Sequence, residues 1–327
     1  GLCSTNMPDL FSGDQLNNPS KYFDVKTYTG TDAAGHNIKG FKFQPDLVWI
    51  KARDHAYSNT LTDAARGVNK YLAADKTNDE ESVANALTAF NSDGFTVSND
   101  QWFNGPHKYV TFCWDAGTAA ATASTDGSIT PTAQWVNATA GFSISAYTGT
   151  GSAATIGHGL GAKPEFIIVK SRDDQSSNQS WTVHHKDVAI ANTLVLDTTA
   201  QAGSSGSWNS TAPTNTVFSV STVEVTNTDD KDYVAYCWTS IPGFSAFGYY
   251  NANNSTDGPA IILPFRPYWV MIKRTNGVNN WIMKDTARGL INPQESTFLA
   301  DSDAAETDYN IKIDFLANGF KIRATDN

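Results

Sequence analysis

Three nine-residue stretches of this chain read FQPDLVWIK (Phe43–Lys51), AKPEFIIVK (Ala162–Lys170) and FRPYWVMIK (Phe265–Lys273). In each stretch a proline precedes an unbroken apolar run, and the run ends at a lysine. Short runs that are rich in β-branched and aromatic residues and follow a proline are typical of a strand buried on both faces. The three stretches therefore predict three equivalent buried strands.

The spacing around these stretches also repeats. A tyrosine precedes the proline at the same distance in each copy, and the lysine follows the proline at the same distance in each copy. Further matches pair TDAARG with KDTARG, NSDGFTV with LANGFKI, and YVTFCW with YVAYCW. A period of roughly 100 residues that preserves these distances indicates tandem copies of one structural unit. The tyrosine–proline pairs are Tyr28 with Pro45, Tyr147 with Pro164 and Tyr250 with Pro267.

We expect an all-β chain of three tandem β-sandwich or jelly-roll-like modules. The modules comprise residues 22–115, 141–240 and 246–327, after an N-terminal lead-in at residues 1–21. Residues 116–140 are rich in small side chains and form a flexible or extended linker. The third module stops before a counterpart of YVAYCW, so we expect it to be truncated.

Local signals refine this expectation. DGF and NGF are hairpin-type turns, which predicts a positive φ at Gly94 and Gly319. One helix is expected over Asn78–Phe90, because two glutamates lie where its first turn would be.

Composition excludes several classes of protein. The 327 residues are 40% hydrophobic, 12% aromatic and only 17% charged, with a formal net charge of -10. An acidic chain without long basic runs is a poor partner for nucleic acid. No apolar run reaches the length of about 18 residues that a membrane span requires. We therefore expect neither nucleic acid nor membrane as a partner.

The cysteine pattern does not form a disulfide framework. Cys3, Cys113 and Cys237 are odd in number and widely spaced. Cys113 and Cys237 occupy equivalent positions in different modules, so we expect both to be reduced and buried.

The chain has no recognisable catalytic, cofactor or metal motif. Nucleophile-elbow, P-loop and dinucleotide patterns are absent, and no Cys/His cluster has zinc spacing. His184–Asp187 is the densest polar cluster, but neighbouring residues on a strand face opposite ways, so the two histidines are structural or surface residues. The acidic stretches 228–232 and 301–308 fit solvated loops better than calcium sites. We expect no enzyme, no cofactor and no metal.

The recurring charged residues have two interpretations. They could form a repeated ligand site, or they could hold the fold, as Asp63 with Arg66 and Asp285 with Arg288 would do in buried ion pairs. The structural interpretation is preferred, because one fold repeated three times requires the same positions three times. The lysines of the set are Lys51, Lys170 and Lys273.

A glycan site is the best candidate for binding. A sugar is held by an aromatic face beside polar groups that orient it. Two loops fit this description, one with Trp102, Asn104 and His107 and the other with Trp208 and Asn209. The alternative is that these tryptophans only cover the edges of the modules.

The repeated motifs resemble a family. FQPDLVWIKAR, LTAFNSDGFTV, AKPEFIIVKSR, FRPYWVMIKR and IDFLANGFKI resemble a repeat domain of large virion proteins of tailed, especially marine, bacteriophages. The resemblance covers nearly the whole chain but carries over no catalytic or binding residue. It implies a structural protein of the extracellular virion, a fibre or appendage that binds a host-surface glycan. The implied partners are other virion proteins and further copies of the chain, most simply in a trimer.

Two alternatives stay open beside the fibre. A capsid decoration protein would bury broad faces against the shell. A polysaccharide depolymerase would need two carboxylates in a cleft. Fold alone does not separate the three functions.

Overall fold

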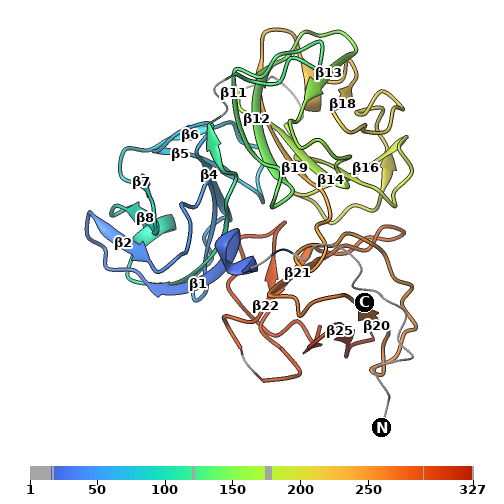
Figure 1. The fold of residues 1–327 in the computed structure, drawn as a ribbon. Helices are drawn as coiled ribbons and strands as arrows, with labels where there is room; N and C mark the ends of the chain where they lie inside the picture. The colour runs from blue at the N-terminus through green and yellow to red at the C-terminus, as the bar shows by residue number, and fades with distance from the viewer. Residues whose placement is uncertain (1–15, 17, 120–121, 174–178, 290, 326–327) are drawn as a thin grey trace.

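The computed structural model describes residues 16, 18–119, 122–173, 179–289 and 291–325, so most of the N-terminal lead-in lies outside the described residues. The fold is all-β, as predicted, and its helices are short: η2 (Pro19–Lys21), α1 (Gln101–Asn104) and α2 (Glu224–Asn227). We call residues 22–115 the first region, residues 141–240 the second region and residues 246–327 the third region. These regions form three lobes around a shared centre (Figure 1).

The first region has two layers. Its main sheet has the order β1-β9-β3-β4-β5-β6, and a second sheet has the order β2-β8-β7. The strands of the main sheet are β1 (Phe23–Thr29), β9 (Lys108–Trp114), β3 (Leu47–Ala52), β4 (Thr60–Asp63), β5 (Lys70–Ala73) and β6 (Glu81–Ser82). Those of the second sheet are β2 (His36–Lys39), β8 (Gly94–Val97) and β7 (Leu87–Asn91).

The second region repeats this plan with more strands. Its main sheet is β10-β11-β12-β19-β14-β15-β16-β17, faced by β13 (Ala154–Gly157) and β18 (Val217–Val220). The main strands are β10 (Thr118–Ala119), β11 (Ala133–Asn137), β12 (Phe142–Thr148), β19 (Asp232–Trp238), β14 (Phe166–Ser171), β15 (Thr182–His185), β16 (Asn192–Val195) and β17 (Gly203–Ser204). The expectation of a plain linker at 116–140 is wrong for β10 and β11, because both extend the sheet from β12.

The third region has two small sheets. They are β21-β22-β23 and β20-β25-β24. Their strands are β21 (Trp269–Ile272), β22 (Ile282–Asp285), β23 (Phe298–Leu299), β20 (Ala260–Ile262), β25 (Gly319–Ile322) and β24 (Ile313–Leu316). Within the described part of the chain, no strand of this region takes the place that β9 has between β1 and β3, or β19 between β12 and β14.

The three predicted buried strands occupy matching registers. Opposite the first residue of β3, β14 and β21 lie Asp63, His185 and Asp285 respectively. β3 and β14 are buried along their whole length and lie inside their sheets, whereas β21 is only partly buried and pairs with β22 alone among the described strands.

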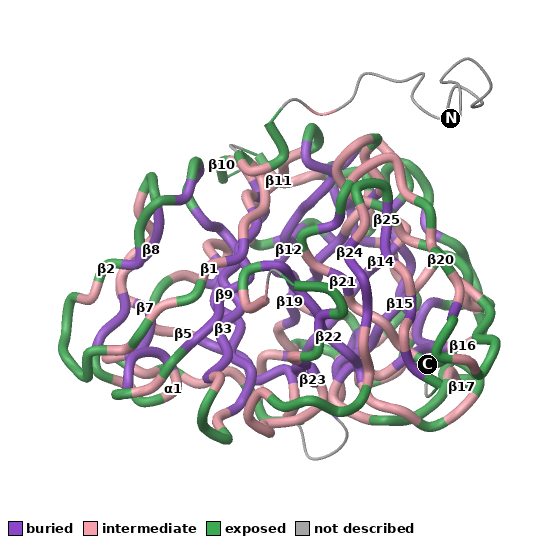
Figure 2. Tube along the Cα trace, turned by 90° about the horizontal axis from the view of Figure 1, so that it is seen from below, coloured by how far each residue is buried: buried purple, intermediate pink, exposed green. Residues whose placement is uncertain are grey.

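Each of these strands separates two cores, because successive side chains point to opposite faces. In β3, Leu47 and Trp49 face a central core, while Val48 and Ile50 face the second layer of the first region. The central core contains residues from all three regions, and buried segments run through the middle of the molecule in Figure 2. The other inward residues are Phe166, Ile168, Trp269 and Met271, and the outward ones are Ile167, Val169, Val270 and Ile272.

Local predictions had mixed outcomes. Gly94 and Gly319 have a positive φ, as predicted, with values of 158° and 134° at the first residue of β8 and β25. Cys113 and Cys237 are free and buried, as expected. The helix predicted over Asn78–Phe90 is wrong, because this stretch contains β6 and most of β7, whose pairing with neighbouring strands overrides the helical signal.

Candidate functional site: contacts between regions and the cavity beside β21

The lysine at the end of each apolar run joins two regions. Its ammonium group donates a hydrogen bond to a backbone carbonyl of a neighbouring region, and each region contacts a different neighbour in this way. The contacts therefore close a ring. The pairs are Lys170 Nζ with Thr77 O (3.3 Å), Lys51 Nζ with Asp303 O (3.0 Å) and Lys273 Nζ with Thr199 O (2.9 Å).

Burial changes the chemistry of these lysines. Lys51 and Lys170 are fully buried, and loss of solvent lowers the pKa of each to about 8. Lys273 is half-buried, and burial lowers its pKa as well. An ammonium held inside a protein requires such carbonyl acceptors, since an unsatisfied buried cation is expensive. The lysines therefore fix the regions to one another.

A second set of contacts follows the same ring. An indole or amide N–H from each region donates to a backbone carbonyl of the same neighbour. The pairs are Trp181 Nε1 with Ala73 O (2.9 Å), Trp281 Nε1 with Val195 O (2.8 Å) and Asn59 Nδ2 with Leu299 O (3.0 Å). Asn59 is thus the donor of this contact in the first region, where the other two regions have a tryptophan donor.

Three aspartates organise both sets of contacts. Asp75, Asp197 and Asp301 each accept a hydrogen bond from the backbone N–H of that same asparagine or tryptophan in their own region. In every region the carbonyl that meets the indole or amide lies two residues before the aspartate, and the carbonyl that meets the lysine lies two residues after it. The acidic stretch at 301–308 was expected to be a solvated loop. That expectation is wrong, because this stretch forms part of an interface.

The third set of contacts differs between the interfaces: two have an arginine–glutamate ion pair, and the other has a backbone hydrogen bond. Arg172 binds Glu80 through two hydrogen bonds of 3.0 Å, and Arg53 binds Glu306 at 2.7 and 3.1 Å. At the interface between the third and second regions, Thr275 and Ala202 meet only through a backbone hydrogen bond of 2.9 Å. Among the residues that the structure describes, two interfaces therefore contain an ion pair between carboxylate and arginine, and the third does not.

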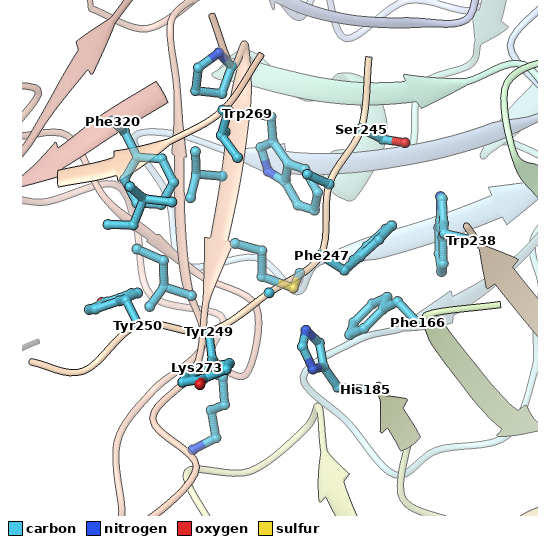
Figure 3. A pocket seen from close by; sticks show the side chains of 18 of the residues that line it. Phe166, His185, Trp238, Ser245, Phe247, Tyr249, Tyr250, Trp269, Lys273 and Phe320 are labelled. Atoms are coloured by element: carbon cyan, nitrogen blue, oxygen red, sulfur yellow. The ribbon is translucent and has the colours of Figure 1, made fainter. Parts of the chain in front are cut away.

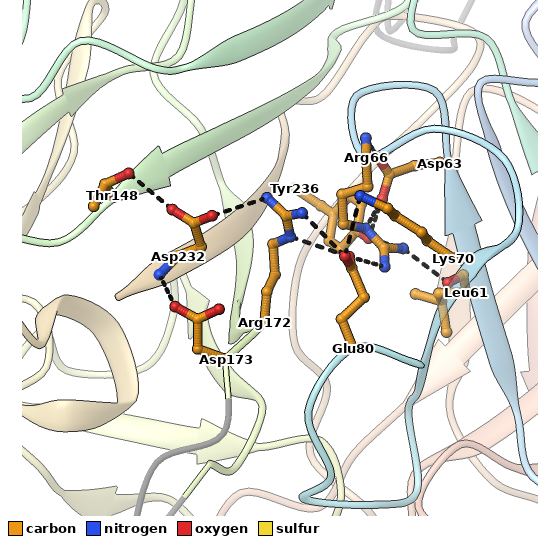
Figure 4. A network of polar contacts seen from close by, with 10 residues as sticks. All are labelled: Leu61, Asp63, Arg66, Lys70, Glu80, Thr148, Arg172, Asp173, Asp232 and Tyr236. Carbon is orange, nitrogen blue, oxygen red and sulfur yellow. Dashed lines mark hydrogen bonds and ion pairs between the residues drawn. The ribbon is translucent and has the colours of Figure 1, made fainter. Parts of the chain in front are cut away.

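Figure 4 shows a network in which Glu80 joins Arg66 of the first region to Arg172 of the second. Arg66 is its most deeply buried cation. Its side chain has no solvent exposure, and it contacts Asp63 at 2.5 Å and Glu80 at 3.1 Å. The hydroxyl of Tyr236, from the second region, donates to Asp63 at 2.7 Å. Lys70 lies 3.8 Å from Glu80, and Arg172 contacts both Glu80 and Asp232. The ion pairs thus join three cations, Arg66, Arg172 and Lys70, to three carboxylates, Asp63, Glu80 and Asp232, so their charges balance.

The carboxylates keep these arginines charged. Burial by itself lowers the pKa of Arg66, but Asp63, Tyr236 and Glu80 outweigh that effect and raise it. Burial raises the pKa of Glu80, but Arg172 and Arg66 outweigh that effect and lower it. The predicted structural ion pairs are confirmed for Asp63 with Arg66 and for Asp285 with Arg288, each buried on both sides.

A large cavity lies beside β21. Its volume is about 1500 Å³, and residues 244–251 and β21 line it together with the inner faces of the other regions. Figure 3 shows Phe247, Phe166 and Trp238 grouped together, with Trp269 apart from them. Phe166 stacks on Phe247 at 5.6 Å, so aromatic rings dominate this surface.

In the first predicted glycan loop, Trp102 and His107 are half-buried and Asn104 is buried. The Asn104 side chain holds the turn at residues 31–36 through two hydrogen bonds. Its Oδ1 accepts from the Thr31 N–H at 3.0 Å, and its Nδ2 donates to the Ala33 carbonyl at 2.8 Å. Trp102 is half-buried against Tyr71. His107 is half-buried and lies 4.5 Å from His55 and 5.4 Å from Tyr57 between ring centroids. Whether this loop binds a glycan stays a prediction.

The second predicted glycan loop does not present an aromatic face. Trp208 is 2% exposed and packs edge-on against His184, while Asn209 is exposed. The expectation of an open ring is wrong for Trp208, because it belongs to the outer core of the second region. His184 faces that core, and its neighbour His185 packs against Phe166 of the central core, as strand alternation predicted.

Sequence reasoning missed the interface residues that matter most. The lysine and tryptophan acceptors are backbone carbonyls, which leave no signature in the sequence. One signal was available: a glutamate follows the aspartate at the same distance in both Asp75–Glu80 and Asp301–Glu306. Within the residues that the structure describes, no group of three His, Cys, Asp or Glu side chains is placed to hold a metal ion.

Comparison with known proteins gives one match. A family model described as a domain of unknown function (DUF7483) matches residues 18–327. No curated protein and no solved structure matches the chain. No helix in the described part of the chain is long and apolar enough to cross a membrane.

Proposed function

The chain belongs to the DUF7483 family of domains of unknown function, and we propose that it folds as three tandem β-sandwich or jelly-roll-like units closed into a ring. The units would be the first, second and third regions. The matching registers of β3, β14 and β21 support this division. The three lysine contacts, each reaching a different neighbour, support the ring.

We propose that the chain is a structural and interaction protein of a bacteriophage virion, in a fibre or appendage. The observation that carries this proposal is the set of buried charged contacts that fixes each region to the next. Removing one partner of a buried pair costs several kcal/mol, so such contacts hold the regions in one arrangement. A fixed arrangement suits a particle component outside the cell, and the resemblance of the repeated motifs to virion repeat domains points the same way.

The host-surface role is proposed for the loop around His107. His55, Tyr57 and His107 form an aromatic cluster, and the Tyr57 hydroxyl donates to Gln101 beside Trp102. Aromatic faces with adjacent amide groups are suited to a sugar ring. His107→Ala with Tyr57→Ala should weaken binding to host glycans on an array, whereas Asn209→Ala in the second region should not.

Electron microscopy of intact particles tests the virion proposal. Gold-labelled antibody against the chain should decorate projecting fibres or appendages. Label spread over the whole shell would favour a capsid decoration protein instead. Particles without label would refute every virion role.

Two further measurements address the remaining alternatives. Release of sugar from host polysaccharide by pure protein, lost on replacing one carboxylate, would favour a depolymerase. The proposed homotrimer predicts a mass of three times 35.3 kDa by light scattering, and a monomer would contradict it.

A further inference from the structure

Two loops of the first region build the aromatic cluster around His107. His55 and Tyr57 come from the connection between β3 and β4, and His107 comes from the connection between α1 and β9. The three rings lie in mutual contact, with centroid distances of 4.3 Å for His55 with Tyr57, 4.5 Å for His55 with His107 and 5.4 Å for Tyr57 with His107. His55 is exposed and the other two are half-buried, so together they form one continuous aromatic surface.

A carboxylate lies at the edge of this surface. The Asp54 side chain is 45% exposed, and its Oδ1 lies 3.4 Å from Nδ1 of His107. The same oxygen accepts a hydrogen bond of 3.1 Å from the backbone N–H of Lys108. Both contacts end on Oδ1, so Oδ2 has no partner among the described residues. The carboxylate is therefore held in one orientation while one of its oxygens stays open to a ligand.

The neighbouring arginine is already engaged within the protein. The Arg53 amide donates to the Lys108 carbonyl at 2.7 Å, and the Arg53 carbonyl accepts the Glu306 amide of the third region at 2.8 Å. The Arg53 guanidinium binds the Glu306 carboxylate. These contacts fix the backbone beside Asp54, and the charge of Arg53 is neutralised by Glu306.

The other charged groups nearby leave the surface negative. Tyr109 points toward α1, where its hydroxyl donates to the carbonyl of Gln101. Since successive side chains of a strand point to opposite faces, Lys108 points away from α1. Burial raises the pKa of the Tyr109 hydroxyl most, and the charges of Asp54 and Asp100 raise it further. Both carboxylates therefore act on this end of the first region.

The chemistry of this surface selects a ligand. Aromatic faces pack against the apolar face of a sugar ring. An ionised carboxylate only accepts hydrogen bonds, and bonds to a charged acceptor are roughly twice as strong as neutral ones. Two neighbouring sugar hydroxyls supply such donors, whereas the carboxylate of an acidic sugar is repelled.

We propose that Asp54 is the specificity-determining residue of this site, and that it selects neutral sugars with two adjacent hydroxyls over acidic sugars. This inference rests on the host-surface role proposed above. The hydroxyls would bind the carboxylate while the sugar ring stacks on His55 and His107. An acidic sugar in the same place would meet an uncompensated negative charge.

The second region provides a matched comparison. Asp173 is the counterpart of Asp54: it also follows an arginine, and it accepts the amide of the first residue of β19, as Asp54 accepts that of the first residue of β9. Lys231 takes the place of His107, because the carbonyl of each accepts the amide of the glycine that directly follows β12 or β1. Holding the start of this strand is therefore a role that both aspartates share, and the histidine beside the carboxylate is particular to the first region.

Exchange of the carboxylate for an amide tests the assignment. Asp54→Asn keeps an oxygen that can accept the Lys108 amide but removes the charge. On an array of neutral hexose oligosaccharides and uronic-acid oligosaccharides, this variant should bind the neutral set about tenfold more weakly than wild type does. Its preference for neutral over acidic sugars should fall by a larger factor, because acidic sugars are no longer repelled. Asp173→Asn, the matched control, should bind like wild type.

Several results would overturn the proposal. An equal loss for neutral and acidic sugars would show that Asp54 only holds the loop, and an unchanged preference would also exclude the assignment; in both cases the host-surface role still stands. Tighter binding of acidic than of neutral sugars by wild type, a comparison that needs no variant, would overturn the ligand class. Wild type that binds neither set would remove the host-surface role itself.

Discussion

Replacing Glu80 by glutamine should destabilise the protein more than an ordinary surface charge change would. Glutamine keeps the shape of the side chain but removes the one negative charge that contacts both Arg66 and Arg172; Asp63 and Asp232 each contact only one of the two arginines. Arg66 has no solvent exposure, so water cannot compensate the excess positive charge. Breaking a buried ion pair from one side costs about 3–5 kcal/mol. Because Asp63 still binds Arg66, we expect a loss of about 3 kcal/mol of unfolding free energy, at the lower end of that range.

The double variant Glu80→Gln with Arg172→Met distinguishes charge balance from simple loss of contacts. Removing Arg172 as well restores neutrality around Arg66 and Asp63. The double variant should therefore be more stable than the sum of the single losses predicts, by about 1–3 kcal/mol. The interface between the second and third regions supports this expectation, because the described residues Thr275 and Ala202 meet there through a backbone hydrogen bond in place of an ion pair.

The effect should also depend on pH. The pKa of Glu80 in the folded protein lies below its ordinary value of 4.5, so its ionic contribution is present above pH 4.5 and disappears as the pH falls through the folded pKa. The stability difference between wild type and Glu80→Gln should therefore narrow in acid.

Urea unfolding followed by tryptophan fluorescence, at pH 7 and in acid, measures these free energies. Glu295→Gln, which removes an exposed partner of Lys312, serves as control and should leave stability unchanged. A loss below about 0.5 kcal/mol for Glu80→Gln would refute the charge-balance reasoning, and so would strict additivity in the double variant.

Three further predictions concern buried groups. Burial and the nearby Arg288 guanidinium lower the pKa of Lys284 to about 7, so the unfolded chain binds more protons than the folded protein above that pH. The stability of wild type relative to Lys284→Met should therefore rise from pH 7 to 8.5 in thermal melts, and parallel curves would contradict this. Burial raises the pKa of the Cys113 and Cys237 thiols, so a Cys3→Ser variant should react with no thiol reagent until denaturant exposes two thiols; labelling of the native protein would exclude this. Gly94→Ala should cost more than about 2 kcal/mol by urea unfolding, because a Cβ there would overlap the backbone oxygen of Ile38 in β2; a smaller loss would mean that the hairpin relaxes.

The sequence predicted the strands better than their assembly. The fixed distances around Pro45, Pro164 and Pro267 were enough to place β3, β14 and β21 in the same register, because strand register follows the apolar pattern. The arrangement around a common core was not predicted. The Lys170 ammonium and the Trp181 indole end on backbone carbonyls of the first region, and any residue type can provide a carbonyl.

The two local predictions that were wrong, a solvated loop at 301–308 and an open ring at Trp208, have a related explanation. Residues 301–308 look solvated because their partner Arg53 lies far away in the chain, in the first region. Trp208 lies among serine, asparagine and threonine, which indicates an exposed loop, but the loop folds its indole into the outer core. Of the two predicted glycan loops, the one around Trp102 and His107 keeps aromatic side chains near the surface.

The closed ring of contacts determines how cooperatively the molecule unfolds. In a linear array of repeats, the units at the two ends have one neighbour each, and they fray first. Here each region donates its lysine to one neighbour and accepts a lysine from the other, so no region is an end. Detaching one region would break two interfaces at once and open the central core that all three share. Melting should therefore be a single cooperative transition, without progressive loss of regions from the ends of the array.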